Sequence, residues 1–514
     1  AAPGPFVFLV LGDSGTGSAA QHELARRINA EEDVSLVLHV GDISQDDGSL
    51  DRLEAHYLAV YAPLMSRVPF FPALGNHDYG TDLAAPCLSV HVLPPSRVPP
   101  PDTGRYYSFD WGEAHFVSLD TNLLVQADAT ERMLAWLERD LGSTSRFWRI
   151  VYFHHPPYPS GHHLEDPISA KVRERLLPIF DRHRVQVVFS GHEHNYQRSK
   201  PLRDGAVVPA GRGSLYFISG GGGAHLYPVG SRPELAFGVE AHHYLRVEVG
   251  SWRMQVSAIT AEGRVLDRIE IAPEPELAAG GVVNAGSFAP RLAPGSLISL
   301  FGVNLAPDQR RAAGLPLPAE LAGTGVFWNQ HALPLLFVSP HQINAQLPYG
   351  AEGRGIVRVR TPNGWAEAAA ILEPAAPAIV RVAQGDALLP AVIRHGTGEL
   401  VSAHSPALPG DTLIIYAIGL GAVNAPVNAG HAPPGPVTVL HRTEVQLGSQ
   451  LLSPSFAGLT PGYPGLYQIH VETPRSLAPG AYPLKVITAG IASEAVTVII
   501  GRQVLAGELE ANAP

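Results

Sequence analysis

Side chains that bind metal ions recur in residues 1–200, most of them directly after a glycine. They are carboxylates, a carboxamide and imidazoles, namely Asp13, Asp42, Asn76, His154, His192 and His194. This mixture of oxygen and imidazole ligands favours zinc, iron or manganese over calcium. Two adjacent cations need a bridging carboxylate, ligands from several separate segments and open positions for water and substrate. The residue types therefore predict a two-metal hydrolytic site.

The segments that precede these side chains have the composition of buried strands: they are short, apolar and rich in β-branched and aromatic residues. They read FVFLVLG, SLVLHVG, VPFFPALG, WRIVYF and VQVVFSG, at 6–12, 35–41, 68–75, 148–153 and 185–191. In open α/β sheets, ligands bind beyond the carboxyl ends of the strands. We therefore expect these strands to bring the metal-binding side chains together at one edge.

Apolar residues at helical spacing separate the predicted strands and predict helices at 20–29, 50–65, 128–141 and 168–183. Asp128 and Glu131 have the spacing of a capping box, which predicts that the third helix starts at Asp128. Further strands are expected at 114–119, 214–218, 244–249, 253–259 and 264–269. Alternating strands and helices followed by strands alone predict an α/β (α+β) four-layer sandwich, in which helices flank two mixed β-sheets.

The composition changes at residues 272–276, Ala-Pro-Glu-Pro-Glu, and helical periodicity is absent beyond them. Short alternating runs between Pro and Gly turns are typical of β-sandwiches, and a weak internal repeat relates 292–302 to 408–419. We predict a catalytic domain at 1–272, immunoglobulin-like sandwich modules at 280–374 and 377–502, and a tail at 503–514. Phe288, Trp328 and Phe337 are assigned to the sandwich cores, and surface or carbohydrate contact is kept as an alternative role for the modules.

The charge and the termini limit the partners and the location. A net charge of −11 over 514 residues argues against a stable nucleic acid partner, which needs clustered Lys and Arg. No apolar run is long enough for a transmembrane segment. The start at Ala1 is interpreted as a mature chain after removal of a signal peptide, which predicts a secreted or periplasmic protein. The single cysteine, Cys87, excludes an internal disulfide and is expected to be buried.

The motifs GDSG, GD, GNHD, HHPPY and GHEHNYQR follow one another in the order and spacing of the calcineurin-like metallophosphoesterases. Over residues 6 to about 270 the chain resembles the purple acid phosphatase branch of that family. The later half resembles the β-sandwich modules of bacterial secreted proteins. The first resemblance implies metal ligands in two groups: Asp13 and His194 for the first metal, Asp42 as the bridge, and Asn76, His154 and His192 for the second metal.

The same resemblance implies roles for residues that do not bind the metals. His77 would reach the substrate phosphate or the leaving group, and Asp78 would orient His77. His162 and His163 would lie over the phosphate. His154 is preferred over His155 as the ligand because it stands two residues before Pro156, as the ligand of the family does.

One position departs from the purple acid phosphatases. Their ferric iron is held by a Tyr three residues after the bridging Asp, where this chain has Gln45. We therefore expect no ferric-tyrosinate centre, weaker binding at the first metal, and divalent Fe, Zn or Mn at both positions. Asp46 or Asp47 is an alternative extra ligand, although both are expected to face solvent.

The predicted activity is hydrolysis of a small phosphomonoester by in-line displacement at a two-metal site. Hydrolysis of phosphodiesters or nucleotides at the same site is the first alternative, because one metal core can serve both. An alternative of another class is a secreted surface-binding protein that carries a vestigial phosphatase domain.

Overall fold

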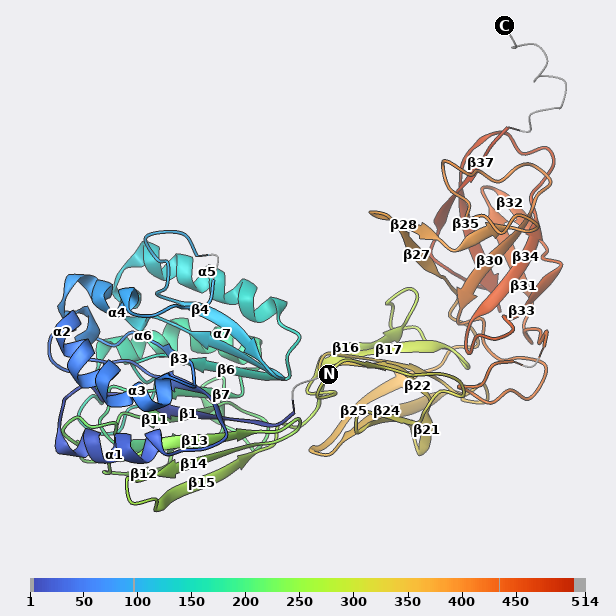
Figure 1. The fold of residues 1–514 in the computed structure, drawn as a ribbon. Helices are drawn as coiled ribbons and strands as arrows, with labels where there is room; N and C mark the ends of the chain where they lie inside the picture. The colour runs from blue at the N-terminus through green and yellow to red at the C-terminus, as the bar shows by residue number, and fades with distance from the viewer. Residues whose placement is uncertain (1–3, 96–97, 434, 503–514) are drawn as a thin grey trace, which may run out of the picture. The chain divides into compact units, whose positions relative to one another are not determined.

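The computed structural model describes residues 4–95, 98–433 and 435–502, so the predicted tail at 503–514 lies outside the described residues. The chain divides into two compact units, Ala1–Glu274 and Pro275–Pro514. Figure 1 shows the helices in the first of these units and strands in both. Within the described residues, no helix is long and apolar enough to cross a membrane.

The first sheet of the N-terminal unit has the strand order β15-β14-β13-β1-β2-β3. Its strands β1, β2 and β3 are parallel, and the other three join them as an antiparallel meander. The bounds are β1 (Phe6–Leu11), β2 (Val34–His39), β3 (Phe70–Pro72), β13 (Tyr244–Val249), β14 (Met254–Ile259) and β15 (Val265–Ile271).

The second sheet has the order β12-β8-β11-β7-β6-β5-β4, with β5, β6, β7 and β11 parallel. Its bounds are β4 (Tyr107–Trp111), β5 (Ala114–Ser118), β6 (Trp148–Tyr152), β7 (Val187–Ser190), β8 (Tyr196–Ser199), β11 (Leu215–Ser219) and β12 (Leu235–Val239). A small hairpin, β9 (Leu202–Arg203) and β10 (Ala206–Val207), stands apart from both sheets. All five strands that were predicted to precede metal ligands are present.

The two sheets pack face to face through alternating apolar side chains. Phe8 of β1 contacts Phe116 of β5 and Phe189 of β7, with ring centroids 5.3 and 6.0 Å apart. The opposite face of the first sheet, including Leu9, joins a buried cluster with the first helices, and Val151 of the second sheet joins a cluster with the later helices. The predicted four-layer architecture of helices, two mixed sheets and helices is therefore confirmed.

The helices are α1 (Ala19–Asn29), α2 (Leu50–Leu53), α3 (Ala59–Met65), α4 (Ala85–Ser89), α5 (Ala127–Ser143), α6 (Pro167–Arg175) and α7 (Leu177–Arg182). A π-helical turn (Glu54–Leu58) joins α2 to α3, and 3₁₀ turns lie at His77–Gly80, Asp82–Ala84 and Thr121–Val125. The predicted helix at 168–183 is divided at Leu176, two residues before Pro178, which has no N–H for a helical hydrogen bond.

The predicted capping box at Asp128 is wrong. Helix α5 begins one residue earlier, and Gln126 takes the N-cap position without a side-chain bond. The hydroxyl of Thr130 donates to the carbonyls of Leu123 and Gln126 instead, so the preceding 3₁₀ turn leads directly into the helix. Asp128 lies within the first turn, where its charge favours the positive end of the helix dipole.

The C-terminal unit consists of antiparallel strands in its described residues. The first two sheets contain β16 (Glu276–Asn284), β17 (Leu297–Val303), β18 (Arg310–Arg311), β22 (Leu335–Val338) and β23 (Gln342–Gln346), and then β19 (Glu320–Leu321), β20 (Thr324–Trp328), β21 (His331–Leu333), β24 (Arg354–Thr361) and β25 (Gly364–Ile371). They enclose one hydrophobic cluster, which includes Ile298 and Trp328.

Most of the remaining strands of this unit enclose a second cluster, which includes Ile415 and Val486. Those around the cluster are β26 (Ala378–Ile379), β29 (Val392–Arg394), β30 (Thr412–Ile418), β33 (Phe456–Leu459) and β34 (Tyr467–Glu472), then β31 (Thr443–Leu447), β32 (Gln450–Leu452), β35 (Gly480–Thr488), β36 (Ile491–Ala492) and β37 (Val496–Ile500). A hairpin of β27 (Arg381–Gln384) and β28 (Ala387–Pro390) forms a separate two-stranded sheet, and most of its side chains are exposed. The division into two immunoglobulin-like modules stays a prediction.

The aromatic residues assigned to the sandwich cores have different surroundings. Trp328 is buried as predicted, and Phe337 is half-buried. The prediction for Phe288 is wrong, since this side chain is 61% exposed. Phe288 lies in the turn after β16 with φ of +55°, and this turn directs the ring away from the core.

Candidate metal centre

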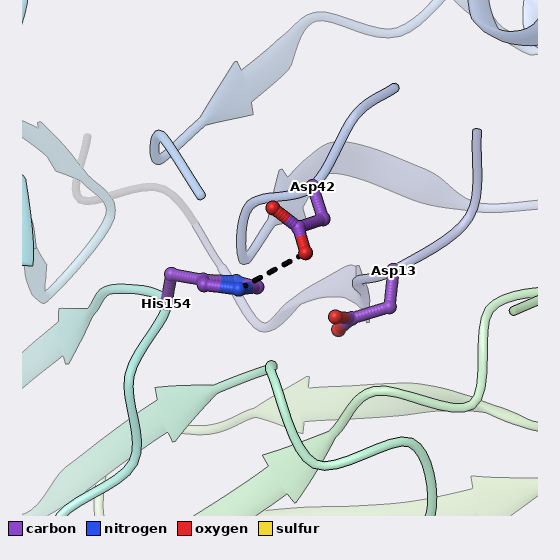
Figure 2. Close-up of side chains that lie close together, drawn as sticks. All are labelled: Asp13, Asp42 and His154. Atoms are coloured by element: carbon purple, nitrogen blue, oxygen red, sulfur yellow. Dashed lines mark ion pairs between the residues drawn. The ribbon is translucent and has the colours of Figure 1, made fainter. Parts of the chain in front are cut away.

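Three predicted metal ligands face one another at the carboxyl ends of β1, β2 and β6. Asp13, Asp42 and His154 are fully buried or nearly so, and their ligand atoms all lie within 4.8 Å of one another. Figure 2 shows the two carboxylates and the imidazole directed toward a common point, with the ion pair between Asp42 and His154. The strands that carry these side chains belong to both sheets, so the centre lies where the two sheets meet.

Three atoms that can bind a metal lie around one nitrogen of the centre, the Nε2 of His154. The Nε2 of His154 lies 3.0 Å from Oδ1 of Asn76, 3.2 Å from Oδ2 of Asp42 and 3.2 Å from Nδ1 of His192. These four residues are the bridge and the predicted ligands of the second metal. Two ring nitrogens and two oxygens at such distances form a donor set of the kind that borderline divalent cations bind.

The predicted ligands of the first metal form a neighbouring pair. Nε2 of His194 lies 3.3 Å from Oδ1 of Asp13. Both carboxylate oxygens of Asp13 also accept the backbone N–H of His192, each at 3.1 Å. This bond ties the strand end of β1 to the turn after β7, so the structure brings all six predicted metal ligands together.

Hydrogen bonds to the backbone orient two of the imidazoles. Nδ1 of His154 lies 3.0 Å from the carbonyl of Val40, and Nδ1 of His194 lies 2.8 Å from the carbonyl of His225. A carbonyl only accepts, so each Nδ1 carries a proton and each Nε2 faces the centre, where its lone pair can bind a cation once Nε2 is deprotonated. A histidine that ligates a metal is commonly held by a bond of this kind.

Burial and neighbouring charges shift the pKa values of the carboxylates and imidazoles of the centre. Burial alone would raise the pKa of Asp42, but His154 and the N–H of His77 lower it to about 2. Burial would lower the pKa of His154, but Asp42 and then Asp13 raise it to about 10. The pKa of Asp13 is raised by burial despite His194. A positive charge between the carboxylates is therefore favoured, and a bound cation would supply it.

Three of the predicted ligands have a backbone conformation that is rare outside glycine. The φ angles of Asp13, Asp42 and His192 are +58°, +51° and +70°. Non-glycine residues in this left-handed region carry strain of about 1 kcal/mol or more, and such residues are concentrated at functional sites. The tight turns after β1, β2 and β7 direct these side chains back toward the centre.

The glycines before the ligands are explained by close contacts between the motifs. A Cβ atom on Gly41 would lie 2.7 Å from Nδ1 of His154, and one on Gly75 would lie 2.1 Å from Oδ1 of Asp42. A Cβ on Gly191 would lie 2.5 Å from Oδ2 of Asp13. Each of these glycines therefore leaves room for a ligand that comes from another strand.

The described hydrogen bonds of the Asp78 carboxylate go to backbone amides, and its predicted role in orienting His77 stays a prediction. Its oxygens accept the backbone N–H groups of Ile43, Ser44 and Gly75 at 2.8–3.1 Å. Asp78 is fully buried, and burial together with Asp42 raises its pKa to about 7. It joins the turns after β2 and β3, which carry Asp42 and Asn76. The buried thiol of Cys87 lies 3.5 Å from the same carboxylate.

The residues predicted to contact substrate lie at the rim of the centre. His77 is half-buried, and its backbone N–H donates to Oδ1 of Asp42 at 2.9 Å. The ring of His163 stacks on that of His192, with centroids 3.8 Å apart. His162 is exposed and stacks on Tyr227 at 4.4 Å. The predicted neighbour of the ligand, His155, is buried, and its Nδ1 lies 2.7 Å from the hydroxyl of Thr121.

Gln45 occupies the position of the missing tyrosine and lies next to Asp42, the predicted bridge. Its Nε2 lies 3.4 Å from Oδ2 of Asp42. The two acidic residues considered as replacements have other partners: Asp46 pairs with Arg52 at 3.3 Å, and Asp47 accepts the N–H of Ser49 at 2.9 Å. The partner of Asp46 lies in α2 and that of Asp47 directly before α2, and both carboxylates are exposed, as expected.

Sequence reasoning missed two side chains and the role of one glycine segment beside the centre. Glu193 is buried and bonds the segment that carries His162 and His163, and the ring of Tyr227 stacks on His194 with centroids 4.4 Å apart. The glycine run at 220–223 packs its backbone against the end of β1, where Gly222 donates to the carbonyl of Gly12 at 3.0 Å. Consecutive glycines indicate that another segment approaches this backbone closely, but that segment, the end of β1, is distant in sequence.

Comparison with known proteins gives a family for the N-terminal unit. Residues 6–196 match the model of the calcineurin-like phosphoesterases. Acid phosphatase type 7 of Mus musculus is 25% identical over 51% of this chain and 66% of its own length. Purple acid phosphatase 23 of Arabidopsis thaliana is 31% identical over 31% of this chain and 35% of its own length. The chain thus spans only part of the length of each relative.

Among solved structures, a purple acid phosphatase from yellow lupin (Lupinus luteus) seeds is similar at 20% identity, with a TM-score of 0.46 over 52% of this chain and 54% of that chain. The family match covers the strands β1–β3 and β4–β7 and extends to the first residue of β8, and it includes all six side chains of the metal centre. The N-terminal part of the chain is therefore a calcineurin-like phosphoesterase domain with purple acid phosphatases among its homologues.

Proposed function

We propose that this protein hydrolyses small phosphate monoesters at a centre of two divalent cations. The observation that supports this most strongly is the convergence of Asp42, Asn76 and His192 on Nε2 of His154, next to the pair of Asp13 and His194. Asp42 lies within reach of both groups of ligands and is the proposed bridge.

The residues fit a pair of cations by their chemistry. Asp13, His194 and Asp42 would hold the first, and Asp42, Asn76, His154 and His192 the second. When bound, two such cations would make a water molecule more acidic and stabilise negative charge on the phosphoryl oxygens. Only three residues are proposed as ligands of the first cation, and the neutral amide of Gln45 cannot replace the anionic tyrosinate. We therefore propose weaker binding of the first cation than of the second.

The rim residues are proposed to act on the substrate itself. A ring nitrogen of His77 would donate a proton or a hydrogen bond to the departing alkoxide, since its backbone is fixed on the bridging carboxylate. His162 and His163 would contact the non-bridging phosphate oxygens from the opposite segment. Donors fixed before the substrate arrives need no rearrangement as charge develops, which is why their placement matters.

Turnover of para-nitrophenyl phosphate by the protein loaded with Mn, Zn or Fe tests this function. We expect hydrolysis that is lost on chelation and restored by the cation, and slower hydrolysis of bis-para-nitrophenyl phosphate. A preference for the diester would favour the phosphodiesterase alternative. Absence of metal-dependent turnover of both compounds would contradict an enzyme and favour a binding protein with a vestigial domain.

Asp42→Asn tests the bridge, with Asp46→Asn as a matched control from the exposed end of the same turn. Loss of a residue that only supports a metal ligand already costs 10–100-fold, so loss of the bridging charge is expected to lower turnover by more than about 100-fold. Metal content, measured by elemental analysis, should fall with it. Asp46→Asn should change neither quantity. Normal metal content and turnover in Asp42→Asn would refute the bridge.

A further inference from the structure

The residue between two predicted metal ligands, Glu193, has a buried carboxylate whose described hydrogen bonds go to residues outside the predicted ligand set. Oε1 accepts the backbone N–H of His162 at 2.7 Å, and Oε2 accepts that of His163 at 2.8 Å. Nδ1 of His163 lies 3.2 Å from the same Oε2. One side chain of the GHEH motif thus accepts hydrogen bonds from two consecutive amides, and lies close to one imidazole, of a segment about thirty residues away in sequence.

The segment 161–163 is shaped to receive this carboxylate. Gly161 has φ of +149°, and a Cβ there would lie 2.5 Å from Oε1 of Glu193 and 2.5 Å from the carbonyl of Pro228. A larger residue would therefore push the carboxylate out of its place. Burial of a carboxylate is costly unless hydrogen bonds compensate for the lost water, so the two amides and Glu193 stabilise each other.

The same contacts determine where the two imidazoles lie. His163 stacks on the proposed ligand His192, with an interplanar angle of 28°. His162 stacks on Tyr227 at 22°, and Tyr227 stacks on the proposed ligand His194 at 8°. Both rings of the segment are thus placed against ligands of the centre, directly or through one tyrosine.

We propose that Glu193 is a positioning residue: it clamps residues 161–163 so that His162 and His163 are held over the metal centre before a phosphate ester binds. This inference rests on the proposed phosphatase function for its consequence, but the clamp itself is independent of it. An error of about 1 Å in the position of a substrate-binding group can cost about 100-fold in rate. The clamp therefore contributes to turnover without touching substrate or metal.

Glu193→Gln is the test, because the amide keeps the shape but can accept only one of the two N–H groups at full strength. The control is Glu31→Gln, another largely buried carboxylate, which bonds Tyr244, Arg246 and Arg27 outside the centre. Hydrogen exchange followed by mass spectrometry on the metal-loaded full chain should show about tenfold faster exchange at residues 160–166 in Glu193→Gln only. Residues 127–143 of α5 serve as an internal reference.

Kinetics with para-nitrophenyl phosphate give the second measurement. We expect kcat/KM to fall about 100-fold in Glu193→Gln at unchanged metal content, and Glu193→Gln combined with His163→Ala to be no slower than the slower single variant. Effects that multiply, or loss of metal in parallel with activity, would overturn the proposal. Gly161→Ala should reproduce the faster exchange by another route if Glu193→Gln does not fold.

The two measurements separate the possible failures. Unchanged exchange at 160–166 in a folded Glu193→Gln overturns the clamp, whatever the activity. A wild-type protein without turnover refutes the proposed function, while faster exchange in the variant still supports the clamp.

Discussion

Several residues in this centre interact with more than one of the sequence motifs, because the motifs are packed against one another. Asp13 is a proposed ligand and also accepts the N–H of the next motif, and Asp78 binds three backbone amides from two turns. Gly75 is required less for its own conformation than for the space that it leaves to Asp42. A substitution at such a position is therefore expected to affect a partner that is remote in sequence.

Gly75→Ala tests this interdependence. The new Cβ would lie 2.1 Å from Oδ1 of Asp42, so the bridging carboxylate must move, and metal retention and turnover should each fall at least about tenfold. The free energy of unfolding should fall by about 1–3 kcal/mol, measured by urea denaturation. Gly314→Ala is the matched control, since nothing lies within 4 Å of a Cβ there. Equal effects of the two substitutions would argue against the packing explanation.

His243 gives the N-terminal unit a pH-dependent stability of its own, outside the metal centre. It is fully buried, its Nε2 lies 3.1 Å from the hydroxyl of Ser219, and burial lowers its pKa from 6.5 to about 4. Below about pH 6.5, the imidazole of His243 therefore binds a proton in the unfolded chain but stays neutral in the folded chain. Its contribution to the free energy of unfolding, about 3 kcal/mol, is fully present above pH 6.5 and is lost as the pH falls to about 4.

His243→Gln removes this titration and keeps a polar group near Ser219. The difference between the unfolding free energies at pH 7 and pH 4.5, measured on chelated protein, should be smaller in the variant than in the wild type. The same pH dependence in both proteins would show that other groups cause the acid sensitivity.

At the scale of elements, parallel strands position the proposed metal ligands, and helices pack against those strands. The turns after β1, β2 and β3 in one sheet and after β6 and β7 in the other reach one edge, because parallel neighbours end on the same side. Helix α5 covers the outer face of the second sheet through a row of buried side chains: Met133, Leu134, Leu137 and Leu141.

Leu137→Ala tests how much this helix contributes. The side chain is fully buried, and its truncation leaves a cavity that should cost about 2–5 kcal/mol of unfolding free energy. Leu50→Ala, at a leucine that is 50% exposed, should change it by less than about 0.5 kcal/mol. Thermal and urea unfolding of both variants provide the measurement, and a cost below 1 kcal/mol at Leu137 would contradict its place in the core.

At the scale of the whole molecule, the proposed metal ligands belong to one compact unit and the β-rich half of the chain forms the other. All six proposed metal ligands lie in the unit Ala1–Glu274, together with three hydrophobic clusters that draw on residues 6–271. The other unit, Pro275–Pro514, has two hydrophobic clusters of its own. Each unit thus contains apolar cores built from its own residues.

A chain of residues 1–274 should therefore fold and bind metal by itself. We expect a cooperative thermal transition, the metal content of the full chain, and at least about half of its turnover of para-nitrophenyl phosphate. The full-length protein prepared in parallel is the control. Aggregation or loss of metal in the short chain would show that the β-rich unit stabilises the phosphoesterase domain.

The sequence by itself determined most of the strands and helices of the N-terminal unit and the residues that are proposed as metal ligands. These follow from local patterns: apolar runs specify buried strands, and the residue type at the end of each run specifies its chemistry. The tertiary structure alone decided which partners these side chains have. Glu193 bonds residues 162 and 163, Asp78 joins two turns, and Tyr227 stacks on His194. Most of these pairs lie about thirty residues apart, and their contacts depend on how both sheets pack, which no local pattern contains.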